Sequence, residues 1–129
     1  MISVDTNVLV RYVTNDDPAQ ARRAAELLAG DDEVFVPKTV LLELAWVLRA
    51  VYRLPGESIR KALLHVLGLP NVHAETPEQV AVALEHYAQG LDFADALHLS
   101  STPSADAFFT FDLAFATRAR ALGAPVEAL

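Results

Sequence analysis

Five acidic side chains stand in apolar surroundings along this sequence, and their spacing decides what chemistry the chain could perform. Asp5 and Asp112 each follow a short apolar run, Met1–Val4 and Ala107–Phe111. Ligands of open parallel sheets bind beyond the carboxyl ends of the strands, so both carboxylates are expected at the same sheet edge. An Asp at such a position is also a common helix N-cap, and for a single Asp that is the simpler interpretation.

Glu43 lies in a nearly all-apolar segment, Thr39–Tyr52, which is predicted to be helical. Its helical neighbours at i±3 and i±4 include no cation: they are Thr39, Val40, Trp46 and Val47. Burying an unpaired carboxylate is costly, so Glu43 must reach solvent, a distant arginine or a metal ion. A salt bridge to a basic residue elsewhere in the fold, such as Arg11 or Arg49, is the alternative that stays open.

Asp92 and Asp95 stand three residues apart in the segment Gly90–His98. On a helix their Cβ atoms lie about 5–6 Å apart, and like charges at that separation repel. A helix cap followed by a first-turn acid, stabilised by the helix dipole, is one interpretation. A cation between the two carboxylates is the other. His98, on the same helical face as Asp95, is interpreted as a packing or hydrogen-bonding group rather than a ligand.

Together, these separate acids predict a metal site with hard oxygen ligands, because the chain has no cysteine and no cluster of histidines. Such a site suits Mg²⁺ or Mn²⁺, which retain water molecules and neutralise phosphate charge. The formal net charge of −7 argues against broad electrostatic adhesion to nucleic acid. Bound divalent cations would reverse the field locally, so the set predicts phosphodiester hydrolysis.

The elements that must position these acids alternate between strand and helix. Apolar runs predict strands at 1–4, 34–36 and 107–111, with weaker ones at 72–74 and 125–127. Periodicity and capping patterns predict helices at 8–13, 18–29, 39–52, 58–67, 77–89, 93–101 and 113–122. The fifth helix carries a capping-box pattern, Thr76-Pro77-Glu78-Gln79. Alternation without a hairpin signature indicates an α/β fold with parallel strands.

Length and composition bound the organisation of the chain. The 129 residues correspond to about one domain, so a single domain over 1–129 is expected. A hydrophobic fraction of 53% with 21% charged residues is too apolar for disorder. No apolar run approaches the roughly 18 residues of a membrane helix, and the N-terminus lacks a signal-peptide pattern. We therefore expect a soluble, cytoplasmic protein without a membrane partner.

Four segments carry a family resemblance: Val4-Asp5-Thr6-Asn7-Val8-Leu9, Glu43, Asp92-Phe93-Ala94-Asp95-Ala96-Leu97-His98 and Thr110-Phe111-Asp112. In this order and spacing they resemble the PIN-domain family, and within it the VapC-like toxin ribonucleases of type II toxin–antitoxin pairs. Each segment alone is a weak signal. The resemblance spans essentially the whole chain, and all four acidic positions of the family are filled.

The resemblance implies a three-layer α/β/α fold with a parallel central sheet of four or five strands. It also implies a metal cluster of Asp5, Glu43, Asp95 and Asp112, with Asp92 as a further candidate ligand. By analogy, Asp5, Asp95 and Asp112 hold one or two Mg²⁺ ions, or Mn²⁺, directly or through water. Glu43 then orients a water molecule or completes the metal's shell.

Three neighbouring polar residues, Thr6, Asn7 and Thr110, look like supporting groups that fix carboxylate rotamers by hydrogen bonds. Ordinary turn capping is the alternative for each of them. Arg11 resembles a basic position after the family's first motif and is a candidate for contacting RNA phosphate. A salt bridge is the plainer interpretation of Arg11.

The implied reaction is metal-dependent endonucleolytic cleavage of single-stranded RNA, which leaves 5′-phosphate and 3′-hydroxyl ends. The implied partners are the RNA substrate, a VapB-like antitoxin and a second copy of the chain in a homodimer. An aspartate-nucleophile phosphatase is a rival, but its second acid would stand where this chain has Asn7. A receiver-type domain would need a lysine near the later strands, and the lysines are Lys38 and Lys61. A non-catalytic PIN-like scaffold is the third alternative.

Overall fold

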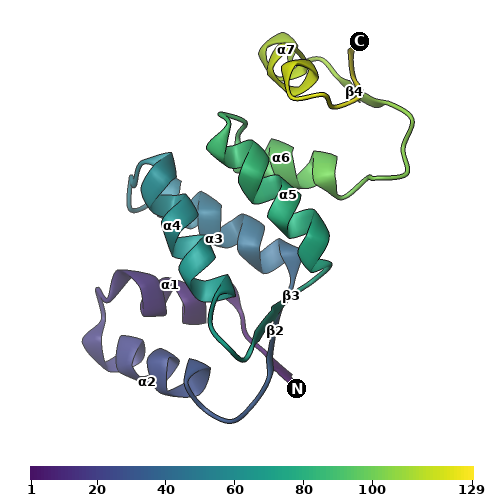
Figure 1. Ribbon diagram of the computed structural model, residues 1–129. Helices are drawn as coiled ribbons and strands as arrows, with labels where there is room; N and C mark the ends of the chain where they lie inside the picture. Colours follow the sequence, from purple (N-terminus) through teal and green to yellow (C-terminus); the bar gives the residue numbers. More distant parts are fainter. The chain divides into compact units, whose positions relative to one another are not determined.

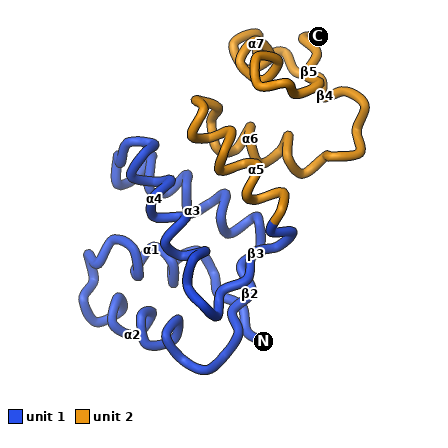
Figure 2. The backbone as a smooth tube through the Cα atoms, viewed as in Figure 1, with its two compact units in different colours: residues 1–77 blue, residues 78–129 orange.

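Five strands and seven helices alternate along the computed structural model, which describes residues 1–129, and every strand pairing is parallel (Figure 1). The predicted α/β class is therefore confirmed. The chain divides into two compact units, residues 1–77 and 78–129 (Figure 2). The single-domain organisation stays a prediction. None of the helices combines the length and the apolar character needed to cross a bilayer.

A three-stranded parallel sheet in the order β1-β2-β3 forms the base of the first unit. Its strands are β1 (Ile2–Ser3), β2 (Val34–Val36) and β3 (Val72–Ala74). Because side chains alternate along a strand, Val34 and Val36 of the central strand are buried on one face while Phe35 points to the other. The weak strand predicted at 72–74 is confirmed. Asp5 lies two residues past the carboxyl end of β1.

Four helices complete the first unit: α1 (Thr6–Thr14), α2 (Pro18–Leu28), α3 (Lys38–Ala50) and α4 (Gly56–Leu67). Helix α1 packs against α2 and α3, and α3 packs against α4. On α3 the fully buried residues Leu41, Leu44 and Leu48 recur at helical spacing. This stripe anchors α3 in the core and leaves Glu43 on an exposed face.

The second unit contains α5 (Pro77–Ala88, with its first residue in the first unit), α6 (Phe93–Ser100), β4 (Phe108–Thr110), α7 (Leu113–Ala121) and β5 (Val126–Ala128). Strands β4 and β5 pair in parallel, and α7 packs against both. The edge strand predicted at 125–127 is present one residue later, at 126–128. Aromatic pairs link the elements: Tyr87 with Phe93 at a centroid distance of 5.4 Å, and Phe108 with Phe115 at 5.9 Å.

One expectation needs correction. The five strands form a three-stranded and a two-stranded sheet, so a central sheet of four or five strands is wrong. Alternation of strand and helix predicts which segments are strands but not which of them pair. Helix α5 begins at Pro77, as the pattern predicts, and Thr76 before it has a φ of 44°. The capping box at 76–79 stays a prediction.

Candidate functional site

The first group of candidate residues lies where the chain leaves β1 and enters α1. Asp5 is the N-cap of α1, and its Oδ1 accepts a hydrogen bond from the backbone N–H of Val8 at 3.3 Å. The second carboxylate oxygen, Oδ2, has no partner in the chain. Capping and ligand binding are therefore compatible at Asp5, because the cap engages only one of the two oxygens.

Glu43 joins this group from α3. The hydroxyl of Thr6, a buried residue at the start of α1, donates a hydrogen bond to Glu43 Oε1. Within residues 1–77, Glu43 has no ion pair with an arginine or lysine. Arg11 pairs instead with Asp16, at 2.9 Å. An open recess of about 410 Å³ is lined by Asp5, Thr6, Asn7, Thr39, Val40, Glu43 and Val47.

Helix caps also position the second group, in residues 78–129. Asp92 caps α6 by accepting from the backbone N–H of Ala94 at 3.2 Å, and Asp95 lies in the first turn of that helix. Asp112 caps α7, and its Oδ1 accepts from the N–H of Phe115 at 3.0 Å. As with Asp5, the other oxygen of Asp112 has no partner.

The carboxylates of this second group interact electrostatically. Burial raises the pKa of Asp95, and the negative charges of Asp92 and Asp112 raise that pKa further. His98 acts in the opposite direction and lowers it. The carboxylate of Asp95 has no hydrogen-bond donor and no ion pair that would offset this crowding. A cation bound among these acids would relieve their repulsion.

Only one of the three predicted supporting residues bonds to a candidate carboxylate, and that is Thr6. The hydroxyl of Thr110 accepts a hydrogen bond from the backbone N–H of Asp112 at 3.0 Å, which is the turn-capping interaction. Asn7 lines the recess beside Asp5 without a side-chain hydrogen bond. Thr110 therefore supports Asp112 through its backbone rather than through its carboxylate.

The structure thus gathers the candidates in two groups: Asp5, Thr6 and Glu43 in the first unit, and Asp92, Asp95 and Asp112 in the second. Neither group by itself places three acidic or histidine side chains as a metal site requires. The donor chemistry nevertheless fits a hard divalent cation. Four of the carboxylates have no basic partner and keep at least one oxygen available: Asp5, Glu43, Asp95 and Asp112.

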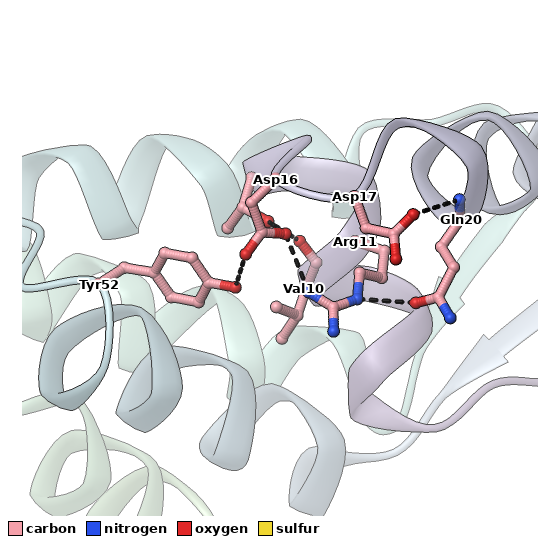
Figure 3. A network of polar contacts seen from close by, with 7 residues as sticks. Val10, Arg11, Asp16, Asp17, Gln20 and Tyr52 are labelled. Carbon is pink, nitrogen blue, oxygen red and sulfur yellow. Dashed lines mark hydrogen bonds and ion pairs between the residues drawn. The ribbon is translucent and has the colours of Figure 1, made fainter.

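One polar network in the first unit contains the salt bridge of Arg11, so the plainer interpretation of that residue is confirmed. Asp16 accepts hydrogen bonds from Tyr52 at 2.5 Å, Arg11 at 2.9 Å and Thr14 at 3.0 Å (Figure 3). These contacts hold the pKa of Asp16 below its ordinary value, and the bond from Tyr52 is the largest cause. Arg11 also donates from Nε to Gln20 at 2.8 Å. The guanidinium of Arg11 is consequently fixed in place between α1 and α2.

Comparison with known proteins agrees with this donor set. The model of the PIN domain family matches residues 2–121, a range that includes all five candidate acids. No curated protein matches the chain. PIN domains are generally metal-dependent nucleases that use divalent ions such as Mg²⁺ or Mn²⁺. Because the match covers nearly the whole chain, the protein belongs to the PIN domain family.

Proposed function

We propose that this protein is a divalent-metal-dependent endoribonuclease that hydrolyses phosphodiester bonds in single-stranded RNA. Membership of a nuclease family supports the general class. The observation that carries the proposal is that these carboxylates keep oxygens without a hydrogen bond or an ion pair. Asp5, Glu43 and Asp112 each keep a carboxylate oxygen without any partner, although arginines capable of pairing are present in the chain.

The residues divide into ligands and a positioning pair. Asp5, Asp95 and Asp112 would hold one or two Mg²⁺ or Mn²⁺ ions, with Asp92 as a further ligand. The bound ion supplies neutralisation of phosphate charge and acidification of water. Thr6 donates to Oε1 of Glu43 and so restrains its side chain, which leaves Oε2 to orient the attacking water and accept its proton.

The biological setting follows from the resemblance to VapC-like toxins. We propose that the nuclease is the toxin of a type II pair, acts as a homodimer and is inhibited by a VapB-like antitoxin. Expression of the chain alone should then arrest growth, and co-expression of the antitoxin should restore it. Growth that is unaffected by the active nuclease would refute the toxin role and leave the nuclease chemistry standing.

The decisive experiment measures cleavage of single-stranded and structured RNA with Mg²⁺ or with a chelator. We expect cleavage of the single strand only with the metal, yielding 5′-phosphate and 3′-hydroxyl ends. Asp5→Asn should abolish cleavage. Asp17→Asn is the matched control, since Asp17 caps α2 by the same type of bond, to Gln20 at 3.1 Å, and does not line the recess. Chelator-resistant cleavage, or full activity of Asp5→Asn, would overturn the proposal.

A further inference from the structure

A second hollow adjoins the carboxylate recess in the first unit. This groove between α1 and α2 has a volume of about 440 Å³. It is lined by Asn7, Val8 and Arg11 from α1 and by Gln20, Arg23, Ala24 and Leu27 from α2. These positions recur at helical spacing, as expected for two facing helices. Asn7 lines both the groove and the recess, so the two hollows share this residue.

The groove contains one unpaired cation, Arg23, together with Arg11, whose charge is paired with Asp16. Two arginines and no acid line it, whereas the formal net charge of the protein is −7. Arg23 is exposed and has neither an ion pair nor a hydrogen bond, so its whole guanidinium is available. Arg11 is held by Asp16 and Gln20 through Nη1 and Nε, which leaves Nη2 without a partner. Guanidinium groups match the geometry of phosphate oxygens.

We infer that this groove binds the phosphate backbone of the RNA strand on one side of the scissile bond, with Arg23 as a phosphate contact. The inference rests on the proposed function. A strand that crosses the recess at Asp5 can continue past Asn7 into the groove, where Arg23 offers an unpaired cation to its phosphate groups. The sugar and base of a nucleotide in the groove would pack against the apolar side chains of Val8 and Leu27. Such a contact positions RNA without selecting its sequence.

The test compares Arg23→Gln with Arg22→Gln, both in an Asp5→Asn background that does not cleave. Arg22 is the matched control, because it is also exposed and unpaired on α2 but does not line the groove. Binding of a fluorescent single-stranded RNA is measured by anisotropy over a range of salt concentrations. We expect Arg23→Gln to weaken binding about twofold to fivefold. It should also reduce the slope of log K against log salt by about 0.7, the value for one lost phosphate contact.

Cleavage kinetics provide the second readout. In the otherwise wild-type protein, Arg23→Gln should raise KM and leave kcat unchanged, since Arg23 does not touch the reacting atoms. Equal effects of the two arginine substitutions on binding, or no effect of either, would overturn the inference. If Arg23→Gln leaves the affinity for RNA unchanged but weakens the binding of an acidic peptide, the groove binds a protein partner instead. If no variant cleaves RNA but binding depends on Arg23, the proposed catalysis fails and the groove assignment survives.

Discussion

Asp112 offers a direct test of whether one carboxylate both caps a helix and takes part in catalysis. Its Oδ1 accepts from the N–H of Phe115 at 3.0 Å, while its other oxygen has no partner. Asp112→Asn keeps an acceptor for the cap but removes the negative charge that a metal ligand needs. Asp112→Ala removes both. The two substitutions should therefore separate stability from activity.

The magnitudes follow from the cap geometry. Replacing an N-cap Asp by Ala costs about 1 kcal/mol, whereas Asn caps almost as well as Asp. For a domain of this size, 1 kcal/mol lowers Tm by about 3–6 °C. We expect that decrease for Asp112→Ala and a change near zero for Asp112→Asn. Both variants should lose at least about a hundredfold in cleavage rate, because even outer-shell partners of a metal cost up to about that much.

Thermal melting followed by circular dichroism, together with RNA cleavage assays, measures both effects. Asp17→Ala and Asp17→Asn form the control pair, with the same pattern of Tm changes and no loss of activity. If Asp112→Asn cleaves RNA at the wild-type rate, Asp112 is a helix cap only. If Asp112→Asn melts as low as Asp112→Ala, the capping bond does not stabilise the protein as argued.

Three further predictions concern other acids and their partners. In the metal-free protein, NMR titration should show the pKa of Asp95 above its ordinary value, and Asp92→Asn should lower it; a pKa that ignores Asp92 would contradict the proposed crowding. Because its partners depress the pKa of Asp16, this residue stabilises the fold above its ordinary pKa of 3.8, and that stability is lost as pH falls through the lower folded-state value. The Tm difference between wild type and Asp16→Asn should thus be present at pH 7 and vanish in strong acid, so a difference independent of pH would refute the assignment. Thr6→Val removes the hydrogen bond to Glu43 and should reduce the cleavage rate about 10- to 100-fold, whereas Thr6→Ser keeps the hydroxyl and should keep the activity. Equal activity of the two variants would count against a positioning role for Thr6.

Local chemistry explains why so much of the helical structure could be predicted. An acidic residue before a helix accepts backbone hydrogen bonds over two or three positions, so Asp17, Asp92 and Asp112 mark helix starts within a short stretch of sequence. Strand pairing depends on contacts between distant segments, which explains why the size of the sheet was not predictable.

The candidate site was predictable in its residue types but not in its contacts. The acids stood out because Glu43 has no cation at helical spacing and because Asp5 and Asp112 follow apolar runs. The hydrogen bond from Thr6 to Glu43 spans 37 residues, and no local pattern reveals it. The same holds for the bond between Tyr52 and Asp16, which spans 36 residues.

The double use of capping aspartates affects how similar sequences should be interpreted. A PIN domain without nuclease activity would still be under pressure to keep the aspartates that correspond to Asp5 and Asp112, since helices begin there. Glu43 lies mid-helix and caps nothing, so nothing in its own helix would resist its replacement once catalysis no longer mattered. The glutamate is therefore a better marker of a working enzyme than either aspartate.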